Sequence, residues 1–361
     1  MLVRVIGRFS ADASSRCVKG MLAVAAVDPC TRRVAACAFD TALLTVHTGS
    51  DPWGMEITSR RVAVILNAGS GDGSAEAAQA LIEPLFRAAG HDVKIALIRA
   101  GDDLQHALDA AIADGVDVIV AGGGDGTVNS VANAILSHDI TLGVLPLGTL
   151  NHFARDLGLP TEMRDAAETI IAGHSIRIDV GEVNGLIFLN NSSVGLYPRI
   201  VQLRERYRAR GLEKWIVAAW ATLRVTRQPR ALRVQIGADG RDVVRITPLI
   251  FIGNNEYRMA GFDAASRASL TGGQLAVYVV KGDGRWAFLR LVWRILIGTA
   301  AETGVLAMST VSEASIDLPF DATITALPVA IDGEVTTLPL PLRYRIRPGA
   351  LRVIVRAPAA G

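Results

Sequence analysis

The chain has 361 residues, of which half are hydrophobic and a fifth are charged, and its formal net charge is +2. This composition excludes a disordered chain, and so small a charge gives no reason to expect a nucleic acid partner. No apolar run reaches the roughly 20 residues of a membrane-spanning helix. The N-terminus also lacks the pattern of a secretory signal, so we expect a cytoplasmic protein. The three cysteines lie early and form no CxxC pair, which excludes a disulfide scaffold or zinc site.

Residues 1–57 differ from the rest of the chain, because short apolar stretches alternate with polar residues and carry no chemical motif. We expect an extension here, either poorly ordered or folded as a small accessory hairpin. A start codon assigned too early would leave the same pattern. The first convincing element is the apolar run 62–66.

From residue 58 to about 160, short β-rich runs alternate with segments of helical period. This alternation predicts an α/β domain with a doubly wound parallel sheet. The expected strands are 62–66, 93–98, 116–120 and 142–145, and the expected helices are 74–89, 103–113 and 128–136.

A further helix begins near Pro160 and ends at Gly173, after which short strands joined by turns dominate. We therefore predict a second, β-rich domain over 161–361, a sandwich or barrel, whose last strand returns to the first domain. The expected strands are 176–180, 186–190, 232–236, 247–252, 275–280, 315–318, 323–331 and 351–355. Two helices are expected near 212–226 and 285–298.

A glycine-rich loop follows the third expected strand. Glycines let backbone N–H groups approach phosphate oxygens, and the N-terminus of the next helix favours negative charge. In such a loop Asp125 can hold Mg²⁺, and Thr127 can cap the helix. The alternative is a tight turn without a ligand. The loop matches neither Walker A nor GxGxxG. Its candidate phosphate-binding residues are Gly122, Gly123, Gly124, Asp125, Gly126 and Thr127.

Two other small polar loops follow strands and should lie at the same carboxyl edge of the sheet, where open α/β sheets bind ligands. One follows the strand 142–145 and the other follows the strand 62–66. A capped helix is the alternative explanation for the first. The candidate nucleotide contacts are Gly148, Thr149 and Asn151 in one loop and Asn67, Ser70 and Gly71 in the other.

A fourth motif, Ile331-Asp332-Gly333-Glu334, lies far along the β-rich part. Alone it is most simply a hairpin turn with a solvated carboxylate. Its meaning changes when all four motifs are read in order, because together they resemble the diacylglycerol kinase catalytic-domain family. That family includes bacterial lipid kinases and the sphingosine and ceramide kinases, and the resemblance runs from about residue 60 to 356.

The resemblance implies roles at matching positions. The loop 122–127 and Thr149 would hold ATP, Asp125 would serve the Mg²⁺–phosphate centre, and Glu334 would be the general base for a lipid hydroxyl. Two positions depart from the family pattern: His152 replaces a frequent aspartate, and Gly272 replaces an aspartate that helps hold a structural Mg²⁺. The structural metal site is therefore in doubt.

The acceptor is harder to predict. The basic and aromatic segment 285–298 is equally consistent with a membrane-surface helix beside a lipid substrate and with a core helix. A homodimer is left open. The rival functions are a kinase of a soluble acceptor, similar to NAD kinase, and a catalytically weak lipid-binding pseudokinase.

Overall fold

A computed structural model describes residues 59–70, 74–99, 101–208, 232–238, 241–257, 267, 269–280, 306–318 and 324–357. Every described residue belongs to the unit Glu56–Gly361. The predictions for 1–57 and for the helices near 212–226 and 285–298 therefore lie outside the described residues. No described helix is long and apolar enough to cross a membrane.

The N-terminal part of this unit is built on four parallel strands in the order β2-β1-β3-β4. Strand β3 is buried along its whole length, as expected for a parallel sheet covered on both faces. The four strands are β1 (Arg61–Asn67), β2 (Asp92–Ile98), β3 (Val118–Gly123) and β4 (Thr141–Pro146).

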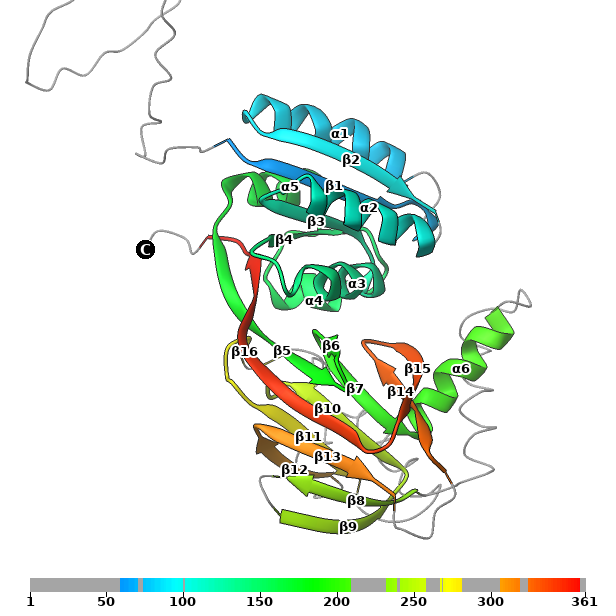
Figure 1. Ribbon diagram of the computed structural model, residues 1–361. Coiled ribbons are helices and arrows are strands. Elements are labelled where there is room, and N and C mark those ends of the chain that lie inside the picture. The colour runs from blue at the N-terminus through cyan, green and yellow to red at the C-terminus, as the bar shows by residue number, and fades with distance from the viewer. Residues whose placement is uncertain are drawn as a thin grey trace, which may run out of the picture. The chain divides into compact units, whose positions relative to one another are not determined.

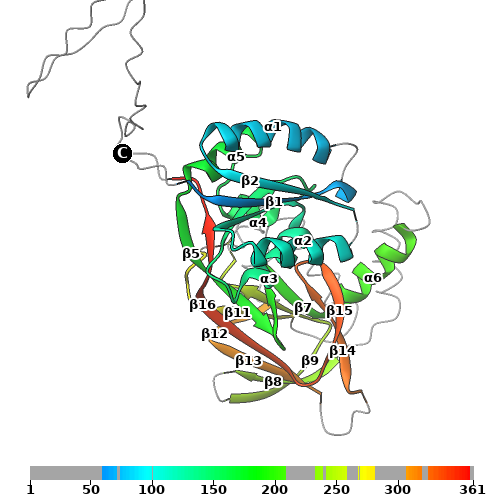
Figure 2. The same ribbon diagram turned by 45° about the horizontal axis from the view of Figure 1, so that its top comes forward.

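Helices cover both faces of these strands (Figures 1 and 2). Helices α1 and α5 share one hydrophobic core with the sheet, and α2, α3 and the short α4 share another. The prediction of a doubly wound α/β domain is confirmed. The bounds are η1 (Ala68–Ser70), α1 (Ser74–Ala88), α2 (Gly101–Ala113), α3 (Asp125–Ile135), α4 (His152–Asp156) and α5 (Met163–Ala172).

One long strand, β16 (Leu342–Ile354), carries this sheet into the β-rich part. Near its end Val353 pairs in parallel with Leu142 of β4, and its beginning pairs antiparallel with β13. Strand β5 runs along its other side. The remaining strands of this sheet are β5 (Ser175–Val183), β6 (Leu186–Phe188), β8 (Leu232–Ala238), β9 (Arg241–Thr247) and β13 (Glu313–Asp317).

A second, fully antiparallel sheet has the order β12-β11-β10-β7-β14-β15. Its inner face and that of the first sheet share one core, which includes Phe188, Val194 and Ile316. The predicted β sandwich is thus confirmed. The bounds are β7 (Asn191–Gly195), β10 (Leu249–Asn254), β11 (Leu275–Val280), β12 (Leu306–Val311), β14 (Ala326–Ile331) and β15 (Glu334–Pro339); α6 spans Leu196–Arg208.

Several element boundaries differ from the predictions. The run 186–190 is divided between β6 and the approach to β7, because the chain changes sheets at Leu189 and Asn190. Helix α3 begins at Asp125, three residues before the predicted 128, since glycine-rich sequence was taken for loop. Strands β7, β9, β12 and β15 were not predicted, and the predicted strand 351–355 covers only the end of β16. Strands β12 and β15 are the edge strands of the second sheet, and β15 has too few buried positions to show a clear apolar pattern.

The strand pair β5–β6 offers a test of the packing. Gly181 lies opposite Phe188, and a methyl group at Gly181 would overlap the buried Phe188 ring, which packs edge-on against Tyr344. We expect Gly181→Ala to lower the free energy of unfolding by about 1–3 kcal/mol, the usual cost of overpacking. Ser175→Ala at the exposed start of β5 is the control and should change it by less than about 0.5 kcal/mol. Equal denaturation curves for all three proteins would contradict this packing.

Candidate functional site

The three polar loops meet at the carboxyl edge of the parallel strands, as predicted. The loop after β3 and the loop after β4 approach so closely that a Cβ on Gly148 would lie 2.5 Å from the Gly124 Cα atom. A side chain at position 148 would therefore force the loops apart. The glycines at this edge serve the packing of one loop against another, in addition to any contact with a ligand.

The loop after β1 joins the same cluster through a side-chain hydrogen bond. Asn67 Nδ2 donates to Thr127 Oγ1 over 2.9 Å, although the residues are 60 positions apart. Thr127 is buried and is the third residue of α3, whose N-cap is Gly124. The suggestion that Thr127 caps this helix is therefore wrong: the hydroxyl accepts a hydrogen bond from the neighbouring loop.

Asp125 connects the glycine loop to α4. Its two carboxylate oxygens accept the backbone N–H groups of His152 and Phe153 over 3.2 Å and 3.0 Å. The carboxylate thus satisfies two backbone donors at the start of α4. The sequence placed this segment in a motif, and a capped helix was considered there only as the alternative explanation. Each oxygen retains a lone pair, so the same carboxylate can still ligate a cation.

Asn151 stabilises its own loop. Its φ of 48° places it in the left-handed region, its Oδ1 accepts the Gly148 N–H over 2.9 Å, and its Nδ2 donates to the Gly148 carbonyl over 2.7 Å. These contacts hold the turn that presents Gly148 to Gly124. Thr149 beside it is exposed.

The fourth motif reaches this edge from the second sheet. Asp332 and Gly333 form the turn between β14 and β15, and Glu334 is the first residue of β15. A Cβ on Gly126 would overlap the Glu334 carboxylate, so glycine at 126 is what admits this side chain. A cavity of about 170 Å³ lies here, with Gly126, Asn129, Asn133, Leu186, Ile187, Ile331, Asp332, Glu334, Val335 and Thr336 around it.

Asp332 fixes the turn. Its Oδ1 accepts the N–H groups of Asn190 and Asn191, and its Oδ2 accepts the Leu189 N–H over 2.7 Å and Asn129 Nδ2 over 2.6 Å. Desolvation raises the pKa of Asp332, and these four donated hydrogen bonds act in the opposite direction. The sequence reasoning assigned a role to Glu334 and overlooked Asp332 and Asn129.

Asn129 and Asn133 lie four residues apart and therefore share a face of α3. Asn129 Nδ2 donates to the Ile187 carbonyl as well as to Asp332, and Asn133 Oδ1 accepts the Ile187 N–H. This spacing was the sequence signal that could have identified the pair. Through these two asparagines, α3 holds both β6 and the turn before Glu334.

The remaining predicted residues have other surroundings. Gly122 and Gly123 are buried in β3, where added methyl groups would meet Leu66 and Thr127. Ser70 ends η1, and Gly71 lies outside the described residues. Nucleotide binding at these positions stays a prediction.

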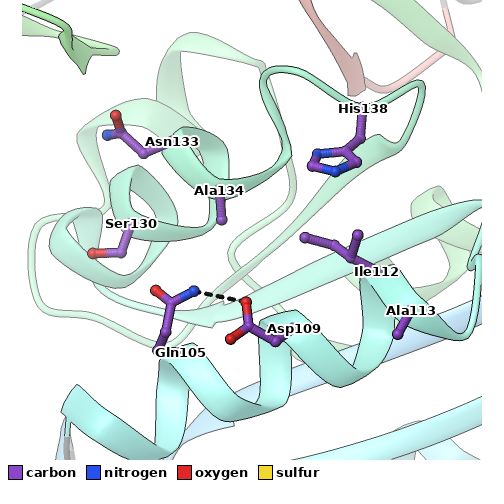
Figure 3. A pocket seen from close by; sticks show the side chains of 8 residues that line it. All are labelled: Gln105, Asp109, Ile112, Ala113, Ser130, Asn133, Ala134 and His138. Atoms are coloured by element: carbon purple, nitrogen blue, oxygen red, sulfur yellow. Dashed lines mark hydrogen bonds between the residues drawn. The ribbon is translucent and has the colours of Figure 1, made fainter.

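A larger cavity of about 520 Å³ lies between α2 and α3 (Figure 3). It is lined by Gln105, Asp109, Ile112, Ala113, Ser130, Asn133, Ala134 and His138, and the Gln105 amide donates to Asp109 over 2.8 Å. None of the four motifs contributes to it. Size alone does not identify a site, so we place the candidate site where the four motifs converge.

The candidate site suits a Mg²⁺ ion that arrives with a nucleotide. Among the described residues, no three Asp, Glu, His or Cys side chains gather as a metal-binding group. Mg²⁺ needs only one or two carboxylates when phosphate oxygens and water complete its shell, and Asp125 offers one. The residues at this edge therefore fit a nucleotide-borne Mg²⁺ and do not form a metal cage of their own.

A second, structural Mg²⁺ does not fit the turn 269–275. The buried Asp179 carboxylate faces this turn and accepts the Gly273 N–H over 2.7 Å, Asn255 Nδ2 over 3.1 Å and the Gly349 N–H over 2.9 Å. A Cβ on Gly272 would lie only 2.8 Å from Asn255 Oδ1, so an aspartate at 272 would require the Asn255 side chain to move from its hydrogen bonds with Asp179 and Gln274. Hydrogen bonds hold the turn.

Two family models match the chain. The one described as diacylglycerol kinase catalytic domain matches residues 61–183, and the one described as YegS C-terminal NAD kinase beta sandwich-like domain matches residues 193–355. The boundary between them falls near the start of β7. The resemblance proposed from the four motifs is confirmed.

Several relatives are named diacylglycerol kinase. The Bacillus subtilis protein is 39% identical over 38% of this chain and 46% of its own length, so that match spans less than half of the relative. The Staphylococcus aureus (strain Newman) protein is 30% identical over 62% of this chain and 71% of its own length. The Mycobacterium tuberculosis (strain H37Rv) protein is 29% identical over 81% and 94%.

Solved structures from Bacillus anthracis str. Sterne share the fold. A diacylglycerol kinase aligns with a TM-score of 0.61 at 24% identity, over 84% of this chain and 99% of its own. Another solved chain from the same organism aligns with a TM-score of 0.65 at 26% identity, over 83% and 99%.

The contacts of Asp332 predict the effect of removing its charge. Asn at this position must turn an NH₂ group toward at least one backbone N–H, because both carboxylate oxygens accept. We expect Asp332→Asn to lower the free energy of unfolding by about 1–3 kcal/mol, the cost of a donor left unsatisfied. Asp139→Asn, which removes an exposed carboxylate, is the control and should cost less than about 1 kcal/mol. Equal losses in urea denaturation would show that the Asp332 hydrogen bonds contribute nothing specific.

Proposed function

Because the chain belongs to the diacylglycerol kinase family, we propose that it is an ATP-dependent lipid kinase. It transfers the γ-phosphoryl group to a lipid hydroxyl in the cleft between the α/β part and the β sandwich. The observation that carries this proposal is the meeting of Glu334, from the second sheet, with Gly126 of the glycine loop. A carboxylate beside a loop suited to phosphate is what phosphoryl transfer to a hydroxyl requires.

Each part of the site has a role in this proposal. The backbone N–H groups of Gly124, Asp125 and Gly126 lie at the N-terminus of α3, where they and the helix dipole favour phosphate oxygens. Asp125 holds the metal while its hydrogen bonds to α4 fix its orientation. When bound, ATP supplies the phosphoryl group and Mg²⁺ neutralises its charge.

Glu334 acts on the acceptor. Its carboxylate accepts the hydroxyl proton as the acceptor oxygen forms its bond to the γ-phosphorus, while the bond from that phosphorus to the β–γ bridging oxygen breaks and ADP leaves. Glu334 lines the small cavity, which we assign to the acceptor headgroup. Asp332 holds the backbone of this turn, so Glu334 is already in position before the reaction begins.

The acceptor is a lipid by analogy with the relatives named diacylglycerol kinase, and we place it at a membrane surface. The segment 285–298, considered for that contact, lies outside the described residues, and the cytoplasmic location and homodimer stay untested predictions. A soluble acceptor is the second candidate, because the C-terminal family model is described as NAD kinase beta sandwich-like. Dependence of activity on lipid vesicles separates the two.

The role of Glu334 is tested by Glu334→Gln. The amide keeps the shape of the side chain but cannot take the hydroxyl proton, so kcat should fall by about 10²-fold or more. The ATP dissociation constant should stay within about twofold, because the proposed nucleotide contacts lie in the loops after β1, β3 and β4. Glu313→Gln, an exposed glutamate on β13, is the matched control and should keep full activity. A fully active Glu334→Gln enzyme would remove this residue from the reaction.

The role of Asp125 is tested by Asp125→Asn. The asparagine oxygen can still accept one N–H of α4, but the charge that balances the metal is gone, so turnover should fall by about 10²-fold or more. Asp117→Asn is the control, because Asp117 also accepts a backbone N–H, that of Arg61, at the opposite end of β3. Turnover of both variants is measured across a range of Mg²⁺ concentrations, and only Asp125→Asn should show the loss. Normal turnover of Asp125→Asn at low Mg²⁺ would contradict the assignment.

A further inference from the structure

A buried ion pair lies beside the candidate site and belongs to none of the four motifs. Arg267 Nε donates to Asp156 Oδ2 over 2.7 Å, and the two side chains are 1% and 8% exposed. Burying both charges costs solvation energy that the attraction between them often fails to recover, so stability alone is a weak reason for such a pair. Its position suggests another role.

The acidic partner is tied to the glycine loop. Asp156 is the last residue of α4, and the first N–H groups of that short helix are bound by Asp125. The Arg267 guanidinium also lies 5.8 Å from the centre of the ring of Phe153, one of the two residues that Asp125 caps. Asp125 and Asp156 are thus at opposite ends of one rigid turn of helix.

The basic partner is tied to the turn that carries Glu334. Arg267 Nη1 donates to the Leu189 carbonyl over 2.6 Å, and Asn254 Nδ2 donates to the same oxygen over 2.8 Å. The Leu189 N–H donates in turn to Asp332 Oδ2. Leu189 therefore joins Arg267 on one side to Asp332 on the other, and Asp332 sets the turn before Glu334.

We propose that Arg267 is a positioning residue, which together with Asp156 holds the Asp125 loop in register with Glu334. This inference rests on the proposed function, since it concerns the alignment of the two groups assigned to phosphoryl transfer. Hydrogen bonds of Asn129 and Asn133 already join α3 to Asp332 and to Ile187 of β6. The Arg267–Asp156 pair adds a separate connection, from α4 to Leu189, which ties the other element bound by Asp125 to the same turn.

Arginine suits this task better than lysine. Its planar fork directs Nε to Asp156 and Nη1 to the Leu189 carbonyl at the same time, whereas a lysine ammonium is a single point on a flexible stem. Arg267→Lys keeps the charge and should recover part of the function that is lost when the charge is removed. That graded response distinguishes positioning from simple charge balance.

The test compares kcat, the KM for ATP and backbone hydrogen exchange in Arg267→Lys and in the double variant Asp156→Asn/Arg267→Gln. The double variant removes both charges, so no unpaired charge is left buried. We expect its kcat per folded molecule to fall by about 10²-fold, as for a misplacement of about 1 Å, with the KM for ATP within about twofold. The kcat of Arg267→Lys should lie between those of the wild-type enzyme and the double variant. Exchange at the Leu189, Asn190 and Asn191 amides should become about tenfold faster in the double variant.

Lys94→Gln is the control. It breaks another charged contact of similar length, the 2.7 Å pair with Asp114, on the edge strand β2, which contributes no residue to these connections, and it should leave kcat and exchange at 189–191 unchanged. A folded double variant with normal kcat, or with unchanged exchange at 189–191, would overturn the proposal. An inactive wild-type enzyme would instead contradict the proposed function, and the exchange measurement would still decide whether the pair holds the turn.

Discussion

The site depends on one carboxylate that is held by backbone donors. Asp332 accepts three successive N–H groups, those of Leu189, Asn190 and Asn191, where the chain passes from the first sheet to the second. It also accepts Asn129 Nδ2 from α3, which begins with the glycine loop. A single side chain therefore fixes the crossing between the sheets, the turn before Glu334 and the distance from that turn to the glycine loop.

Close packing explains why two positions of the site are glycines. Gly148 is needed where it meets Gly124, and Gly126 is needed where it meets Glu334. In the turn 269–275 the Asn255 side chain occupies the space beside Gly272, so a side chain at 272 would require Asn255 to move. Asp179 and backbone donors stabilise this turn with hydrogen bonds.

The sequence predicted the parallel strands well because periodicity and strand-end loops are local signals. The run 62–66 became β1 and the run 93–98 became β2, with one residue added at most at either end. Contacts between distant segments could not be predicted in this way. The bond from Asn67 to Thr127 and the pair Arg267–Asp156 join residues 60 and 111 positions apart, and neither shows a local pattern. Glu334 was identified only through family resemblance, since a turn carboxylate is common on protein surfaces.

The central claim is that the site transfers phosphoryl groups to a lipid. The most direct measurement is transfer of label from γ-labelled ATP in the presence of Mg²⁺, with vesicles containing diacylglycerol, sphingoid base or phosphatidylglycerol in one set of reactions and NAD in another. The account predicts label in the extracted lipid of at least one vesicle reaction and none in NAD. Label in NAD alone, or in no acceptor while the protein remains folded, would contradict it.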